Sequence, residues 1–134
     1  MLRNRPRHYR ITLGDAIGAH ERALKFGGRH GIQDLGLVES AIARPFNGYY
    51  RSIHKKAAAL LHSVATNHGF TDGNKRTAFY LFYLFIGNSG YELESQSHLE
   101  AEEEIEHLIV DVVTKFIDFD ELVAWLKKRI RPIS

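Results

Sequence analysis

The stretch "HGFTDGNKRTAFYLFYLFI", residues 68–86, joins a polar, glycine-containing segment directly to an apolar one. From residue 74 to 86 nearly every face of a helix would be apolar, which is typical of a helix buried at the centre of a fold. Its longest apolar run, Phe79 to Ile86, is far shorter than the ~20 residues that span a bilayer. We therefore expect a soluble, cytoplasmic protein without membrane association, built around a buried central helix at about 74–86.

The rest of the chain predicts five further helices around this one. Apolar residues at helical spacing and capping sequences mark them, and glycine or proline ends several of them. A short extended piece is expected at 91–93. The predicted fold class is an all-α bundle of six helices in a single domain of residues 1–134, with a core at about 12–130 and a basic N-terminal arm at 1–10. The other helices are expected at about 12–26, 34–43, 53–67, 97–114 and 118–129.

Composition limits the functional classes. The 134 residues contain no cysteine, which excludes disulfides and thiolate metal sites. The net charge of +2 is too small to indicate a nucleic-acid-binding protein, and we expect no direct contact with nucleic acid. Basic residues gather near both ends and acidic ones at 92–106, which we interpret as solvated helix faces. A basic rim around an anionic ligand is the alternative.

The polar segment has the features of an anion site. Thr71, Asp72 and Gly73 form a turn sequence, and the helix begins at about Asn74. The backbone N–H groups of residues 73–76 would then point away from a helix N-terminus, where the helix dipole favours anions. The cations Lys75 and Arg76 stand at this positive end and need an anion to balance them. Gly73 would let a phosphate approach the backbone closely.

Two further side chains suggest chemistry at this anion site. Asp72 is placed to bind a hard cation such as Mg²⁺ that bridges phosphates. His68, at the end of the preceding helix, could take a proton from an attacking hydroxyl. Phe70 is expected to point inward and anchor the loop. A single histidine at a helix end is more often a cap, and an Asp-Gly pair is usually only a turn, but together these residues favour a phosphate-handling site.

Two other classes of site fit the segment poorly. A helix–turn–helix module must expose polar side chains of its second helix to bases, whereas Phe79 to Ile86 exposes almost none. An EF-hand loop needs alternating oxygen ligands and a closing glutamate, which the sequence after Asp72 lacks.

The pattern His-x-Phe-x-Asp-Gly-Asn-Lys-Arg at residues 68–76 resembles the signature of the Fic/Doc family, most closely its Doc (death-on-curing) toxin branch. The segment "GRHGIQDLGLVESAIAR", residues 28–44, followed by Pro45, is similar to the N-terminal half of Doc proteins. The resemblance covers about residues 13–90. It implies a Fic/Doc-type helical bundle with a short flap at 44–50 that clamps a target segment.

The resemblance also implies an activity, which is ATP-dependent transfer to a hydroxyl of a protein. His68 would be the general base, Asp72 the Mg²⁺ ligand and Phe70 the buried anchor. Asn74 and Arg76 would contact phosphates, and Arg76 would join His68 and Asp72 as a catalytic residue. Gly73 and Lys75 complete the expected nucleotide-binding set.

One departure from the wider family bears on the reaction. Fic AMP-transferases have a second glycine and a distal arginine where this chain has Lys75 and Phe79. Doc proteins share the pattern seen here, and in them the nucleotide is implied to bind reversed and to present its γ-phosphate. The resemblance thus implies phosphorylation, with elongation factor Tu as the target and arrest of translation as the result. AMP transfer to another target, or a degenerate family member, is the alternative.

The sequence also bears on how such a toxin would be inhibited. Self-inhibited family members carry Ser/Thr-x-x-x-Glu-Gly/Asn, and no serine or threonine of this chain begins that pattern. The resemblance therefore implies a separate cognate antitoxin, with a disordered segment that folds as a helix into an apolar groove beside the site.

Overall fold

Helix α4 (Asn74–Asn88) lies at the centre of the fold. In the computed structural model, which describes residues 8–94 and 98–134, it packs against α3 (Ile53–Thr66), α1 (Leu13–Ala23) and α5 (His98–Val113). This confirms the predicted central helix. Its buried residues are Thr77, Ala78, Phe79, Leu81, Phe82, Phe85 and Ile86.

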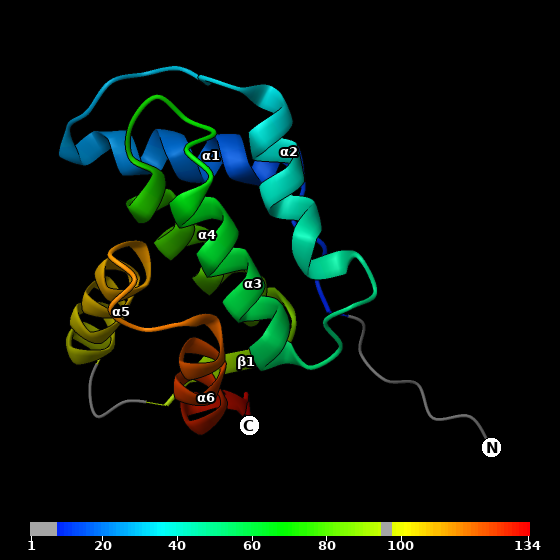
Figure 1. Cartoon of the computed structure of the whole chain (residues 1–134). Helices are drawn as coiled ribbons and strands as arrows, with labels where there is room; N and C mark the ends of the chain where they lie inside the picture. The colour runs from blue at the N-terminus through cyan, green and yellow to red at the C-terminus, as the bar shows by residue number, and fades with distance from the viewer. Residues whose placement is uncertain (1–7, 95–97) are drawn as a thin grey trace.

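Two more α-helices complete the set, α2 (Leu35–Ala43) and α6 (Phe119–Arg129), so the expectation of six helices holds within the described residues. Figure 1 shows α5 and α6 on one side of the α3–α4 pair and α2 on the other. Two short 3₁₀ turns, η1 (Leu24–Phe26) and η2 (Arg44–Phe46), extend α1 and α2. None of the helices in this part of the chain combines the length and apolar character needed to cross a membrane.

Capping residues in the local sequence determine where most of the helices begin. Thr12 and Asp118 form capping boxes with Asp15 and Glu121, as their sequences predict. The capping box predicted at Ser97 lies outside the described residues. Helix α4 was expected to end at about Ile86, within the segment from Gly87 to Gly90. It continues through Gly87 to Asn88, and the positive φ that terminates the segment falls at Gly90, with φ 88°.

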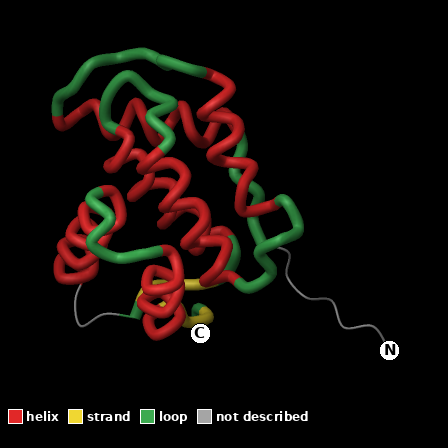
Figure 2. The backbone as a smooth tube through the Cα atoms, viewed as in Figure 1, coloured by secondary structure: helices red, strands yellow, loops and turns green. Residues whose placement is uncertain are grey.

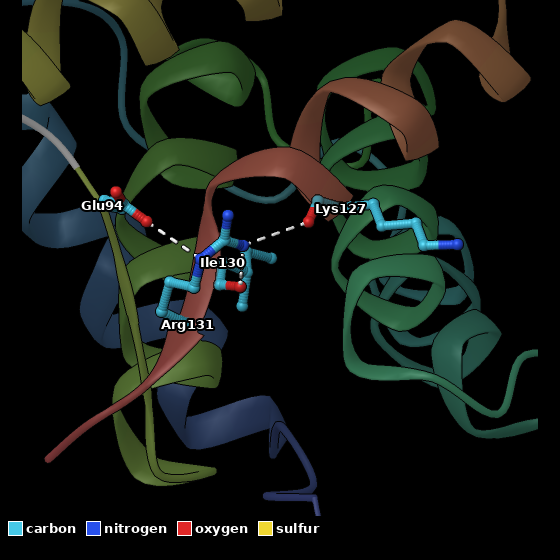
Figure 3. Close-up of polar contacts among 4 residues, drawn as sticks. All are labelled: Glu94, Lys127, Ile130 and Arg131. Atoms are coloured by element: carbon cyan, nitrogen blue, oxygen red, sulfur yellow. Dashed lines mark hydrogen bonds and ion pairs between the residues drawn. The ribbon is translucent and has the colours of Figure 1, made fainter.

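A small antiparallel ribbon closes the end of the bundle near the C-terminus (Figure 2). The predicted extended piece forms β1 (Tyr91–Leu93), which pairs with an unpredicted strand, β2 (Ile130–Pro132), directly after α6. Figure 3 shows the polar contacts of Arg131 that stabilise this ribbon and its connection to α6. Its Nε lies 2.9 Å from Glu94 Oε2, and its Nη1 donates to the carbonyls of Lys127 and Ile130. The ribbon ties the end of α6 to the end of α4.

Two histidines accept hydrogen bonds from cations in the bundle. Lys56 Nζ donates to His8 Nδ1 at 2.8 Å, and Arg44 Nη1 donates to His62 Nδ1 at 2.7 Å. Each acceptor nitrogen must be unprotonated for this bond to form. Burial, followed by the neighbouring cation, lowers the pKa of His8 and of His62 below the ordinary value.

As the pH is lowered, the fold should therefore lose stability at pH values above those at which its carboxylates become protonated. Because these histidine pKa values are lowered in the folded state, the unfolded chain binds more protons below about pH 6.5. The contribution of the two neutral histidines to stability is complete above that pH. It is lost as the pH falls through their pKa values in the folded state. Urea unfolding should show a decreasing midpoint from about pH 7 to about pH 5. His62→Gln should flatten this slope, and His30→Gln, at an exposed position, should not.

Candidate active site

The loop between α3 and α4 is held in place by residues that precede α2. The carbonyl of Gly69 accepts hydrogen bonds from the N–H groups of Gln33 and Asp34, at 2.9 and 3.0 Å. Thr71 donates its N–H to the carbonyl of Gly31 at 3.0 Å. Figure 1 shows the two loops side by side at the top of the molecule. The backbone of the polar segment is therefore fixed by a second, distant segment.

Phe70 anchors this loop, as predicted. Its side chain is 3% exposed and stacks on the ring of His20, with centroids 4.0 Å apart. Beside it, Gly69 lies so close to α2 that an added Cβ would stand 2.6 Å from Val38 Cγ2. His20 in turn places its Nε2 2.8 Å from the carbonyl oxygen of Asp72. Sequence reasoning missed His20, although its position on the apolar face of α1 marked it as buried.

Asn74 closes the loop through its side chain. Its Nδ2 donates to the carbonyl of Phe70 at 3.0 Å, and its Oδ1 accepts from the N–H of Phe70 at 3.1 Å. The amide is therefore engaged with the loop backbone. In this geometry, Asn74 can offer a phosphate its backbone N–H, while its side chain holds Phe70 in register.

The N-terminus of α4 is open to an anion. Gly73 is the cap residue with φ 75°, a left-handed conformation that favours glycine, and no side chain of the described residues caps the helix there. The N–H of Gly73 donates to Asp72 Oδ1 at 2.9 Å. The next N–H groups, of Asn74, Lys75 and Arg76, lie in the first turn, where a helix supplies no acceptors. They are the donors that a phosphate would meet.

Asp72 joins the loop to the segment before α2. Its Oδ2 accepts from the N–H of Arg29 at 3.1 Å. Gly28 leaves room for the carboxylate, since a Cβ there would lie 3.1 Å from Asp72 Oδ2. The hydrogen bond from Arg29, followed by that from Gly73, holds the pKa of Asp72 below its usual range, so the carboxylate is ionised at neutral pH.

This carboxylate fits the expected Mg²⁺. Both oxygens keep a lone pair after their single backbone hydrogen bonds. Among the described residues, no group of three or more His, Asp or Glu side chains could hold a metal by itself. Mg²⁺ is commonly bound by one or two carboxylates together with substrate phosphates, and Asp72 at the mouth of an anion site matches that arrangement.

His68 follows the C-cap of α3 in a left-handed conformation, with φ 54°. Such a backbone is uncommon for a residue other than glycine, and it often marks a functional position. The side chain is exposed and makes no hydrogen bond to any described residue. The imidazole is therefore available to a substrate.

A cleft of about 500 Å³ brings the predicted residues together. Its lining is polar along residues 68–76 and mostly apolar where α5 contributes. The polar lining comprises His68, Thr71, Asp72, Gly73, Asn74, Lys75, Arg76 and Glu106, and the apolar lining comprises Ala65, Phe79, Ile109, Val110 and Val113.

Arg76 points across this cleft to other elements. Its guanidinium lies over the ring of Phe26, 4.2 Å from the centroid, and its Nη1 is 4.0 Å from Glu106 Oε1 on α5. Glu106 was not predicted, because it belongs to the acidic stretch that we interpreted as a solvated face. Its carboxylate places a negative charge beside the expected phosphate position.

Glu106→Gln should therefore strengthen the binding of a phosphate-bearing ligand in this cleft. The change removes a charge that repels phosphate and releases Arg76 toward the helix N-terminus. With ATP as the test ligand, we expect the affinity to rise by roughly two- to fivefold, the range of an exposed ion pair. Calorimetric titration measures it. Glu103→Gln removes an exposed acid of α5 outside the cleft and serves as the matched control. Equal affinities in both variants would contradict this role of Glu106.

Comparison with known proteins identifies the family. The model of the Fic/DOC family matches residues 10–86, more than half of the chain. The chain belongs to the Fic/DOC family. It is also 36% identical over 110 residues to the Toxin Doc of Mycolicibacterium smegmatis, across 78% of this chain and 82% of that protein. The mostly helical architecture with a small two-stranded sheet agrees with this Fic/DOC assignment.

The Fic/DOC match contains all the polar lining residues of the cleft except Glu106. It ends at residue 86, so α5 and α6 lie beyond it. The apolar lining residues from α5 therefore lie outside the part of the chain that the family match describes.

Proposed function

We propose that this Fic/DOC protein is a Doc-like toxin that transfers the γ-phosphoryl group of ATP to a hydroxyl of a protein. The observation that carries the proposal is the position of His68, whose unengaged imidazole lines the same cleft as the open N-terminus of α4. A proton acceptor beside a phosphate site is the arrangement that phosphoryl transfer to a hydroxyl needs. The similarity to Toxin Doc supports the toxin assignment.

The proposed reaction uses few groups. The target hydroxyl oxygen attacks the γ-phosphorus, the bond from that phosphorus to the β–γ bridging oxygen breaks, and ADP leaves. His68 takes the hydroxyl proton at a ring nitrogen. The first-turn N–H groups of α4, with Lys75 and Arg76, bind and orient the phosphates. Mg²⁺, held by Asp72, would neutralise phosphate charge.

Lys75 and Phe79 favour phosphoryl over adenylyl transfer. Lys75 is exposed and lines the cleft, where it adds charge and bulk at the phosphate position. Phe79 is 8% exposed and has no group that could pair with a phosphate. An AMP-transferase of the usual Fic pattern would need glycine and arginine at these two positions.

Asp72→Ala should remove Mg²⁺-dependent nucleotide binding, because the cleft would lose its carboxylate at the phosphate mouth. Calorimetry with a non-hydrolysable ATP analogue, with and without Mg²⁺, measures the effect. The variant also loses the tie to Arg29, so urea unfolding should accompany the titration. If a folded variant keeps the metal dependence of the parent chain, Asp72 is a turn residue only.

We propose elongation factor Tu as the target, and a separate antitoxin as the partner that restrains the protein in the cytoplasm. Expression of the chain alone should arrest growth, and co-expression of an adjacent open reading frame should relieve the arrest through a stable complex. Elongation factor Tu recovered from arrested cells should carry the mass of one added phosphoryl group. An adenylyl mass would identify an AMP-transferase, and unmodified factor in arrested cells would refute this target.

A further inference from the structure

The imidazole of His20 is buried, with 5% of the residue exposed, and the proposed transfer reaction makes no use of it. His20 belongs to α1, which packs against α4 (Figure 1). A buried polar group is normally hydrogen-bonded, and its partner shows what it holds in place. The partner of His20 lies in the active-site loop, at the peptide group that joins Asp72 to Gly73.

The ring of His20 is fixed on two sides. It stacks on the ring of Phe70, with centroids 4.0 Å apart and planes inclined by 11°. It also lies against the start of α4, where a Cβ added to Gly73 would stand 3.8 Å from His20 Cδ2. These two contacts set the orientation of the imidazole without any ligand in the cleft.

His20 donates a hydrogen bond to the backbone of the loop. Its Nε2 lies 2.8 Å from the carbonyl oxygen of Asp72, and because a carbonyl can only accept, this nitrogen carries the proton. The carbonyl shares one planar peptide group with the N–H of Gly73, so a bond that fixes the carbonyl also fixes the direction of this N–H. Gly73, with φ 75° and no Cβ, would itself tolerate other orientations of the peptide.

The direction of the Gly73 N–H determines how the carboxylate of Asp72 is held. This N–H donates to Asp72 Oδ1 at 2.9 Å, and the N–H of Arg29 donates to Oδ2 at 3.1 Å. If the peptide between Asp72 and Gly73 turned over, Oδ1 would lose its donor and the carboxylate would be held at one oxygen only. The bond from His20 thus controls the carboxylate through a single peptide group.

We infer that His20 is a positioning residue, which orients the carboxylate of Asp72 and the N–H groups at the start of α4. That these groups receive Mg²⁺ and phosphates rests on the proposed function, whereas the control of their direction by His20 does not. His20 does not line the cleft, so its contribution to binding is indirect. Residues that orient a metal ligand typically contribute a factor of about 10–100 to metal affinity.

Three substitutions separate the hydrogen bond of His20 from its packing. His20→Phe keeps an aromatic ring against Phe70 and removes the donor. His20→Gln removes the ring and keeps an N–H donor at a similar distance from the backbone. His20→Met has the length of glutamine without the donor, and it replaces His20→Phe if that variant does not fold. Urea unfolding identifies the folded variants, and His30→Phe, at an exposed position outside the cleft, is the control.

The first readout needs no nucleotide. The residual dipolar coupling of the Gly73 N–H reports the direction of this bond in the full chain. We expect it to change in His20→Phe and His20→Met, and to keep the parent value in His20→Gln and His30→Phe. The second readout is calorimetric titration with a non-hydrolysable ATP analogue and Mg²⁺. The two variants without a donor should bind the analogue roughly 10–100-fold more weakly, and His20→Gln should bind it about as tightly as the parent chain.

Two results would overturn the inference. A Gly73 N–H with the parent direction in a folded variant without the donor would show that the peptide does not depend on His20. An equal loss of binding in His20→Gln and His20→Met would assign the effect to the packing of the ring alone. A parent chain that does not bind the analogue would instead refute the proposed function, and the dipolar couplings would still decide the role of His20.

Discussion

Replacing His68 by alanine is expected to lower the rate of phosphoryl transfer by about 10²–10⁴-fold, the usual contribution of a general base. The imidazole lines the cleft, makes no hydrogen bond to a described residue, and is exposed, so its loss removes a proton acceptor without opening the core. Single-turnover transfer from ATP to the target measures the chemical step. Growth arrest by the expressed protein should disappear together with the transfer activity.

Two further variants separate chemistry from structure. His68→Asn also lacks a base, but asparagine tolerates the left-handed backbone that His68 adopts, so its fold should match that of the parent chain. His30→Ala removes an exposed histidine outside the cleft and should transfer normally. An unchanged rate in a folded His68→Asn protein would remove His68 from the mechanism.

Phe70→Ala should destabilise the protein by about 3–5 kcal/mol, the usual cost of truncating a buried phenylalanine. The ring is 3% exposed and stacks on His20, while its backbone is held by Asn74. The resulting cavity would lie directly under the loop that carries His68 and Asp72. Urea unfolding gives the change in free energy, and nucleotide binding should weaken with it.

Phe116→Ala is the matched control for Phe70→Ala. It removes the same side chain where the ring is 79% exposed, and the change in stability should stay within about 0.5 kcal/mol. A loss for Phe70→Ala as small as that of the control would show that the loop does not depend on its anchor.

Much of the fold could be predicted because its signals are local. The apolar character of α4 and the capping boxes at Thr12 and Asp118 lie within a few residues of the structures that they determine. Strand β2 could not be predicted, since it exists through its pairing with β1, about 40 residues earlier. Gly87 misled the prediction of the end of α4, because a glycine near a helix end can also adopt helical angles.

The candidate site likewise has a part that could be predicted from the sequence and a part that could not. Residues 68–76 were predicted together because one loop and one helix turn carry them all. Arg29, His20 and Glu106 reach the site from other elements, and no local pattern connects them to it. The side chain of Asn74 was expected to contact phosphate, and its engagement with Phe70 became visible only in the folded loop.

The most direct test of the central claim is to determine which phosphate of ATP is transferred to the target protein. The full chain would be incubated with its target protein, Mg²⁺ and ATP labelled either on the γ-phosphate or on the α-phosphate, with His68→Asn in parallel. Transfer of the γ-label to protein, absent in the variant, is the predicted result. Transfer of the α-label instead would contradict the account and identify this Fic/DOC protein as an AMP-transferase despite Lys75 and Phe79.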